Sequence, residues 1–262
     1  MSKLVFITGA SSGIGQALAK CYIEHGDRVA MVARRSQELQ DWCEQAGLPQ
    51  ERCFVYKADV RDARAITAAG QQCMNEVGVP DIVIAAAGIS IGVDTEVFSD
   101  IEVMRRLYET NNIGMMATFH PFISEMKKRG SGKLVGIASV AGIRGLAGHG
   151  AYCSSKAAVI SYCESLRLEM RHATGSNGVQ VLTILPGFVA TPLTQKNPYV
   201  MPFMLTAEEF AKRATGVIDK GRSYAVIPWQ MGVAAKGLRL LPNFLYDALF
   251  SGRKRKPREG EL

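Results

Sequence analysis

The sequence lacks any uninterrupted apolar run approaching the roughly 20 residues that a membrane-spanning helix needs. It enters an apolar segment at Leu4 almost at once, which leaves no room for a signal peptide before it. Apolar residues form 47% of the 262 positions and charged residues 21%, values typical of a globular domain with a sizeable core. We therefore expect a cytoplasmic protein.

The sequence is also poor in the residues that bind metals. It has four histidines and six cysteines, without a C-x-x-C pair or a Cys/His group at zinc spacing. The cysteines lie mostly in apolar, periodic segments, which is typical of free thiols buried in a reducing compartment. We expect no metal site and six free thiols, at Cys21, Cys43, Cys53, Cys73, Cys153 and Cys163.

The net charge of +7 is concentrated at the C-terminus. Residues 253–258 carry five positive charges and Glu259 and Glu261 remove two, so residues 251–262 hold +3 of the total. The rest of the chain is only mildly basic, which argues against a nucleic-acid partner. The tail alone suits an anionic surface.

Apolar runs alternate with helical patterns along the chain. Several runs are apolar almost end to end, as in parallel strands that helices cover on both faces. The predicted strands are Leu4–Thr8, Arg28–Ala33, Cys53–Lys57, Ile82–Ala86, Lys133–Ala138, Val179–Leu185 and Tyr224–Pro228. Helical spacing covers Ile14–His25, Arg61–Val77, Ile101–Met126 and Tyr152–Arg171. These units indicate an α/β fold, a Rossmann-like, doubly wound sheet of seven mostly parallel strands.

The domain organisation is simple, because no internal repeat, linker or break in composition marks a second domain. We expect residues 1–230 to form one dinucleotide-binding and catalytic domain, with a substrate lid at about 192–220. Residues 231–262 differ in character and are expected to hold amphipathic helices and the basic tail.

The segment Thr8–Gly15 follows the first strand and opens the first helix. Glycines suit a turn whose backbone angles exclude side chains and where a pyrophosphate approaches bare N–H groups at a helix N-terminus. A tight turn without a ligand is the simpler alternative. The strand–turn–helix context favours a dinucleotide site.

Two arginines follow the second strand, where NAD-binding folds usually place an acid that accepts from the ribose hydroxyls. Here the strand ends at Ala33, followed by Arg34 and Arg35. A guanidinium pairs with a 2′-phosphate that an acid would repel. We therefore predict NADP(H) over NAD(H), with Arg34 as the main contact and Arg35 as a second, against the alternative of two solvated arginines at a helix start.

Asp59 closes the third strand. Its carboxylate can accept from an adenine amino group, or it can cap a helix that begins at Arg61. The residues alone favour neither reading.

Tyr152 and Lys156 lie four residues apart in a helical segment and so share one face. A nearby ammonium is expected to lower the pKa of the phenol, which makes an acid/base pair near neutrality. Ser139 ends a strand at the carboxyl edge, where open α/β sheets bind ligands. Its hydroxyl either holds a substrate carbonyl or caps a turn.

These motifs resemble those of the short-chain dehydrogenase/reductase family, of the shorter single-domain type, over roughly residues 3–230. The glycine motif T-G-x-x-x-G-x-G matches from Thr8 to Gly15, and the active-site motif Y-x-x-x-K matches Tyr152 and Lys156. Ser139 matches the family's serine, and Asn111 precedes Gly114 as its N-x-x-G asparagine does. The family's Pro-Gly segment appears at 186–191.

The resemblance implies an oxidoreductase that moves hydride between NADP(H) and a carbonyl or secondary alcohol. Tyr152 would donate the proton, Ser139 orient the carbonyl, Lys156 lower the Tyr152 pKa and bind the ribose, and Asn111 hold a relay water. It also favours the adenine role for Asp59. The implied cofactor contacts are Gly9, Ser11, Ser12, Gly13, Ile14, Gly15, Arg34, Arg35, Asp59, Val60, Ala87, Gly88, Tyr152, Lys156, Pro186, Gly187, Val189 and Thr191.

The sequence departs from the family at one motif. Relatives usually carry N-N-A-G after the fourth strand, whereas this chain has alanines at 85–87 and then Gly88. In relatives the missing asparagine ties neighbouring strands and shapes the cofactor floor. No catalytic group is lost, so the expectation of an enzyme stands.

The segment Asn197–Leu205 is apolar and carries two prolines, which disfavour a continuous helix. As a lid it would suit a bulky or apolar substrate, and ordinary lid packing is the alternative. His149 reads either as a substrate contact or as a loop histidine, and we favour the loop histidine.

Residues 231–250 form a pattern of two short amphipathic helices before the basic tail. They either lie on an anionic membrane, at the inner face, or pack on the lid or a partner subunit ahead of a disordered tail. Relatives also imply a homodimer or homotetramer.

Two other functions are compatible with the fold. A non-catalytic NADP(H)-binding sensor or interaction protein would keep the glycine turn, but such proteins tend to lose the catalytic residues that are present here. An epimerisation or an enoyl reduction on the same scaffold is disfavoured by chain length and motif spacing.

Overall fold

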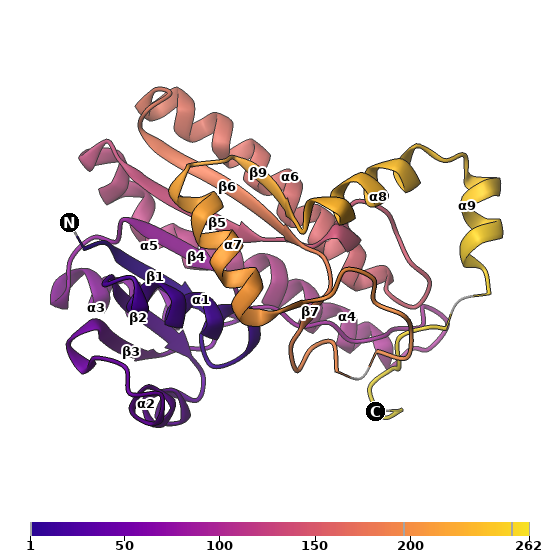
Figure 1. Ribbon diagram of the computed structural model, residues 1–262, viewed down its shortest axis with the longest axis horizontal. Coiled ribbons are helices and arrows are strands. Elements are labelled where there is room, and N and C mark those ends of the chain that lie inside the picture. The colour runs from indigo at the N-terminus through magenta and orange to yellow at the C-terminus, as the bar shows by residue number, and fades with distance from the viewer. Residues whose placement is uncertain (1, 196, 253, 262) are drawn as a thin grey trace.

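A computed structural model describes residues 2–195, 197–252 and 254–261. Seven parallel strands form one sheet in the order β3-β2-β1-β4-β5-β6-β9 (Figure 1). Their bounds are β1 Leu4–Thr8, β2 Arg28–Ala33, β3 Cys53–Lys57, β4 Ile82–Ala85, β5 Gly132–Ile137, β6 Val179–Pro186 and β9 Tyr224–Ile227. The order reverses at β1 and β4, so the two halves of the sheet diverge there. This confirms the predicted Rossmann-like fold.

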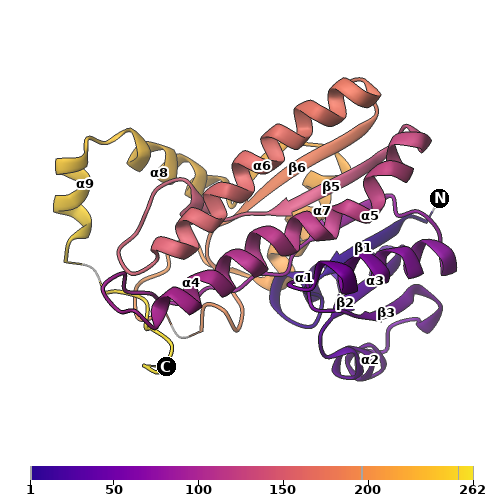
Figure 2. The same cartoon turned by 180° about the vertical axis from the view of Figure 1, so that it is seen from behind.

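Helices cover both faces of the sheet. One apolar core joins it to α3 Ala63–Glu76, α5 Gly114–Arg129 and α6 Gly150–Thr174, as seen from behind in Figure 2. The other joins it to α1 Gly13–Glu24, α2 Ser36–Gln45 and α7 Ala207–Asp219. Strands covered on both faces must be apolar throughout, which explains the continuous runs in the sequence.

The predicted helix over Ile101–Met126 is interrupted. It consists of α4 Asp100–Tyr108, a π-helical turn over Glu109–Ile113, and then α5. Such single-turn bulges inside helices frequently lie at functional sites. This one carries Asn111.

The third helix begins later than predicted, at Ala63, because Asp62 is its cap and accepts from the N–H groups of Arg64 and Ala65. Asp59 therefore does not cap this helix, and that alternative was wrong. Short 3-10 turns lie over Gln50–Arg52 and Val140–Gly142.

Only the first part of the expected lid at about 192–220 is irregular, up to Leu205, where regular structure resumes. Two-residue strands, β7 Val189–Ala190 and β8 Leu205–Thr206, pair at its base. The helix α7 that follows belongs to the core and packs against α1. No continuous helix forms between these strands in the described residues, as the prolines predicted.

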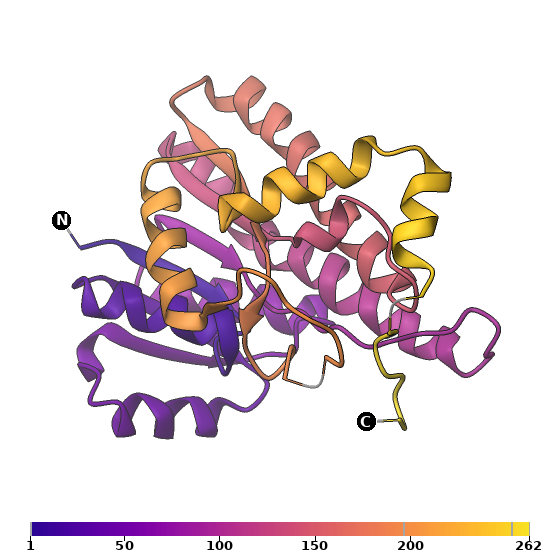
Figure 3. The same cartoon turned by 45° about the vertical axis from the view of Figure 1, so that its right-hand side comes forward.

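The C-terminal residues form α8 Trp229–Leu240 and α9 Asn243–Phe250, which extend away from the sheet (Figure 3). Apolar side chains are exposed on them, with Leu240 85% and Phe244 70% exposed. The described part of the tail then returns and lies against the body, so the alternative of a disordered tail does not hold there. Among the described residues, no helix combines the length and apolarity needed to cross a membrane.

Candidate active site

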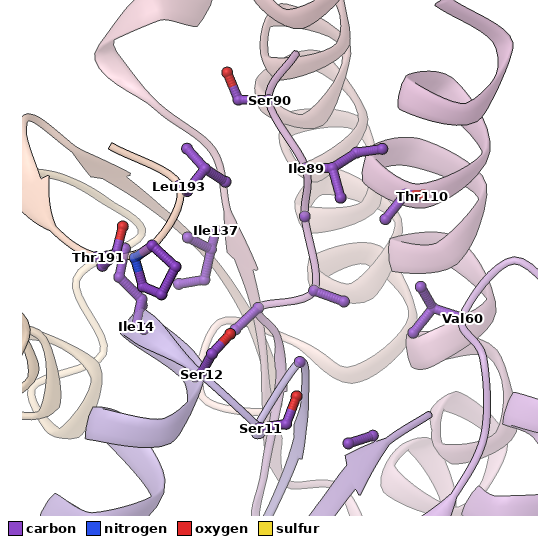
Figure 4. A pocket seen from close by; sticks show the side chains of 18 of the residues that line it. Ser11, Ser12, Ile14, Val60, Ile89, Ser90, Thr110, Ile137, Thr191 and Leu193 are labelled. Carbon is purple, nitrogen blue, oxygen red and sulfur yellow. The ribbon is translucent and has the colours of Figure 1, made fainter. Parts of the chain in front are cut away.

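One cavity of about 600 Å³ runs along the carboxyl ends of the strands. Figure 4 shows Ser11 and Ser12 of the glycine turn at one end, and Ser90 and Leu193 toward the other. Every residue expected to contact the cofactor lines this cavity, as do Ser139, Tyr152 and Lys156. A pocket of this size at the point where strand order reverses is where such sheets bind nucleotides.

The glycine turn at β1 is built on close backbone approach. Gly9 has φ +71°, and a Cβ there would lie 2.6 Å from the Cα of Ala87. A Cβ on Gly15 would lie 2.3 Å from the Gly9 carbonyl oxygen. The turn therefore excludes side chains at Gly9 and Gly15, and both glycines line the cavity, which fits the pyrophosphate of a dinucleotide.

Charged residues surround the end of the cavity at β2 and β3. Arg34 and Arg35 both line it and are exposed, and Arg35 also pairs with Glu38 at 3.2 Å. Asp59 is held by Arg61 at 2.7 Å, and the hydrogen bonds from Arg61 lower the pKa of its carboxyl. Arg61 is a third guanidinium at this end, which the sequence reading missed.

Tyr152 lies in the first turn of α6, and its phenol lies beside the hydroxyl of Ser139, just after β5. Burial raises the pKa of the Tyr152 phenol to about 12, and the neighbouring Ser139 hydroxyl acts in the opposite direction. The expected lowering of this pKa by Lys156 is not found: desolvation is the largest cause of the shift, and Lys156 is not among the groups that contribute to it. The phenol is therefore protonated at neutral pH. Ser139 also caps the following turn, where its Oγ accepts from the N–H of Ala141 at 3.2 Å.

Lys156 is one helical turn beyond Tyr152 and is almost fully buried. Its Nζ donates to the Ile137 carbonyl oxygen at 2.9 Å and lies 5.9 Å from the centre of the Tyr152 ring. Burial alone lowers its pKa to about 8. The ammonium is thus fixed between strand β5 and the tyrosine, and its charge is lost in mildly alkaline solution.

Asn111 is buried and joins the π-helical turn to two other elements. Its Oδ1 accepts from the N–H of Ile89 at 2.9 Å, and its Nδ2 donates to Ser155 Oγ at 3.0 Å. A Cβ on Gly88 would lie 3.3 Å from Asn111 Oδ1 and 3.4 Å from Lys156 Nζ. The amide and the ammonium therefore converge on the same point of the β4 loop, although Asn111 itself does not line the cavity.

Of the two alanines at the expected asparagine positions, Ala86 lines the cavity, whereas Ala85 is a buried residue of β4. Ala87, which follows them, also lines the cavity and packs directly against Gly9. The glycine turn and the loop after β4 are therefore in direct backbone contact. The opposite wall is formed by Pro186, Gly187, Val189 and Thr191.

The lid contacts the residue that precedes α6. Tyr199 Oη lies 3.2 Å from His149 Nε2, and its ring also lies against Phe188. Burial lowers the pKa of His149, so the ring is neutral near pH 7. His149 is thus a buried partner of the lid, consistent with the reading that we favoured.

Several lining residues carry no motif and were missed by sequence reasoning. Most are apolar strand or loop positions, and nothing in their spacing marks them. The missed residues are Val32, Ala33, Ala58, Arg61, Ile89, Ser90, Ile91, Arg106, Thr110, Ile137, Ala138, Pro192, Leu193 and Thr194.

Comparison with known proteins agrees with this geometry. A family model described as short chain dehydrogenase matches residues 3–199. The chain belongs to the short-chain dehydrogenase family. An uncharacterized oxidoreductase from Myxococcus xanthus is 37% identical over 253 residues, which cover 94% of this chain and 95% of that protein. The chain is accordingly an oxidoreductase of this family, as the motifs predicted.

Solved structures show the same fold with either nicotinamide cofactor. A short chain dehydrogenase from Burkholderia cenocepacia in complex with NADP has a TM-score of 0.79 and 22% identity, covering 95% of this chain and 97% of that one. A relative from Burkholderia phymatum in complex with NAD has a TM-score of 0.79 and 21% identity, covering 98% and 97%. Short-chain dehydrogenases of this fold therefore bind NADP or NAD, and this chain's preference rests on its own residues.

Proposed function

We propose that the protein is an NADP(H)-dependent carbonyl reductase or secondary alcohol dehydrogenase. One observation carries this proposal: Ser139, Tyr152 and Lys156 line the same cavity as the glycine turn. A non-catalytic sensor would have no need of a buried acid beside a buried ammonium.

The preference for NADP(H) rests on the charge around Ala33. Arg34 and Arg35 line the cavity where an NAD-binding fold usually has an acid, and Arg61 adds a third guanidinium. Arg35 forms an ion pair with Glu38, and Arg61 forms one with Asp59, so both guanidinium groups already have an anionic partner. Arg34 is therefore the main contact for a 2′-phosphate.

The cofactor, when bound, supplies or accepts the hydride. Ser139 donates a hydrogen bond from its hydroxyl to the substrate oxygen and so orients the carbonyl. Tyr152, protonated at neutral pH, donates its phenolic proton to that oxygen as negative charge develops. In the reverse direction the phenolate takes the alcohol proton, so oxidation needs a higher pH.

Lys156 and Asn111 support the proton transfer. The ammonium, held by the Ile137 carbonyl, stabilises the phenolate that remains after donation. Asn111 is placed at Gly88 with Lys156, and we assign it the positioning of a water that returns a proton to this pair. Its bonds to Ile89 and Ser155 fix that position.

The substrate is expected to be bulky and apolar near its carbonyl. Ile89, Ile91 and Leu193 line the cavity, and the lid brings Tyr199 against His149. Apolar lining with few polar groups is usual for pockets that orient apolar molecules.

The remaining expectations concern assembly and location. We propose a homodimer or homotetramer in the cytoplasm, as the family resemblance implies. Contact with an anionic membrane finds little support in the tail, since Arg255, Lys256 and Arg258 make contacts within the chain. Failure of the purified protein to co-sediment with anionic vesicles at low salt would remove that possibility.

The central experiment is NADPH oxidation against ketones and aldehydes of graded size. Tyr152→Phe should bind NADPH normally and lose about 100- to 10,000-fold in kcat, which is the usual contribution of a general acid. Turnover close to that of the wild type in this variant would refute the assignment of the acid.

A further inference from the structure

The C-terminal segment Arg255–Glu261 docks on the loop after β4. The Gly92 N–H donates to the Pro257 carbonyl oxygen at 3.1 Å, and Gly92 and Arg258 form a parallel bridge. A Cβ on Gly92 would lie 2.2 Å from the Lys256 carbonyl oxygen. The two backbones therefore approach as closely as only glycine permits.

Ion pairs hold this segment on both sides of Lys256. Arg255 pairs with Asp94 at 2.9 Å, and Arg258 makes two bonds to the buried carboxylate of Asp100 at 2.8 and 3.0 Å. Glu259 pairs with Arg106. Each of these charges is neutralised by its partner, whereas Lys256 has no ion-pair partner among the described residues.

Lys256 is 6% exposed although it belongs to a charged tail. Its Nζ donates to Ser90 Oγ at 3.0 Å and to the Leu193 carbonyl oxygen at 3.2 Å, and both partners are uncharged. Ser90 and Leu193 line the cavity from two different loops, at the end away from the glycine turn in Figure 4.

Burying an ammonium among neutral partners is costly, and an adjacent anion offsets the cost. Burial lowers the pKa of Lys256 to about 8, with no carboxylate contributing. Beside the tail, the Nε of Arg106 is buried without a hydrogen-bond partner among the described residues, and Arg106 lines the cavity as well. Arg106 is already paired with Glu259, so the ammonium of Lys256, which is bonded to the lining residues Ser90 and Leu193, is the cation at this end without an anionic partner among the described residues.

We propose that Lys256 binds an acidic group of the substrate, so that the substrate is an oxo acid or hydroxy acid with its carboxylate or phosphate remote from the reacting carbon. This rests on the proposed function. The apolar side chains of Ile89, Ile91 and Leu193 line the cavity that the connecting part of the molecule occupies. Lys256 acts on substrate affinity and not on the proton transfer.

The test compares oxo carboxylic acids with their methyl esters, and oxo phosphates with matched neutral ketones. The wild type should favour the acids by about tenfold or more in kcat/KM, which corresponds to about 1.4 kcal/mol. Lys256→Met should remove that preference through KM, with kcat unchanged. Lys256→Arg should keep most of it. If Lys256→Met lowers kcat/KM more for the oxo carboxylic acids than for the oxo phosphates, the acidic group is a carboxylate. The opposite order indicates a phosphate.

Two variants separate binding from tail docking. Lys254→Met changes an exposed residue near Lys256 and should leave kcat/KM unchanged for the acids and for their neutral counterparts. Arg258→Gln loosens the tail and should lower activity on esters and acids together. If Lys256→Met instead lowers both series equally, Lys256 only anchors the tail and the proposal is overturned.

A binding measurement keeps the result independent of turnover. The Kd of the acids for the Tyr152→Phe variant with NADPH is measured by calorimetry, with and without Lys256→Met. Weakening by tenfold or more supports the acidic subsite, even if no compound is reduced and the proposed function fails. An equal Kd overturns the subsite, even if neutral ketones are reduced.

Discussion

The side-chain amide of Asn111 and the backbone of Ile89 bond to each other twice, through Oδ1 at 2.9 Å and Nδ2 at 3.1 Å. One residue of a π-helical turn thereby fixes the loop after β4. That loop carries Gly88, the point on which Asn111 and Lys156 converge, and Ser90, the contact of Lys256. Asn111 therefore fixes the position of Gly88, beside Lys156, and of Ser90, beside Lys256.

Asn111→Ala should reduce both stability and turnover. Removing the amide leaves the N–H and carbonyl of Ile89 without their partner, which costs about 1–3 kcal/mol per unsatisfied group. Urea denaturation measures the loss, and kcat should fall more than NADPH affinity. Unchanged kcat beside reduced stability would limit Asn111 to a structural role.

Arg34→Asp should weaken NADPH binding by about 10- to 100-fold, because a charge-assisted hydrogen bond contributes about 1.5–3 kcal/mol. NADH binding should improve, since the new carboxylate can accept from ribose hydroxyls. Fluorescence titration gives both Kd values. The matched control is Arg35→Gln. It should weaken NADPH binding less, because Arg35 already forms an ion pair with Glu38.

The kcat/KM for reduction of a neutral ketone should fall as pH rises through about 8. The ammonium of Lys156 is charged below that pH and neutral above it, whereas the phenol of Tyr152 stays protonated to about 12. The decline therefore reports Lys156, and kcat/KM reflects the free enzyme. In Lys156→Arg, kcat/KM should not decline between pH 7 and 9. A decline in that variant would mean that a group other than Lys156 causes the pH dependence.

Alcohol oxidation should show the opposite dependence on pH. The phenolate of Tyr152 is the base, and its fraction grows about tenfold for each pH unit below the pKa. The ratio of oxidation to reduction at saturating substrates should rise steadily from pH 6 to 9. A ratio independent of pH would exclude Tyr152 as the group that carries the proton.

Gly9→Ala should destabilise the fold by about 1–3 kcal/mol through overpacking, since its Cβ would lie 2.6 Å from the Cα of Ala87. NADPH binding should be lost with it. Gly216→Ala is the matched control, because this exposed helical position has open space around it. That substitution should raise stability by about 0.5–1 kcal/mol.

Much of the site could be predicted because its residues stand at fixed places in strand–helix units. Tyr152 and Lys156 share a helix face, and Thr8–Gly15 joins a strand to a helix, so their positions follow from local geometry. Arg61, Arg106 and Ser90 could not be found this way, since each reaches the cavity only through the packing of its element.

The pKa values required the tertiary structure as well. Proximity of Lys156 in sequence predicts a lowered pKa for Tyr152, yet burial of both groups reverses the direction. Desolvation depends on every element that surrounds a side chain, and no spacing along the chain encodes it.

The sequence by itself determined the sheet, the glycine turn and the catalytic motif, because hydrophobic periodicity and motif spacing are local properties of the chain. Only the tertiary structure decided where the basic tail lies. Its charges suit a lipid surface in isolation, but Asp94 and Asp100, more than 150 residues earlier, pair with Arg255 and Arg258. Contacts between such distant segments arise only when the fold brings them together.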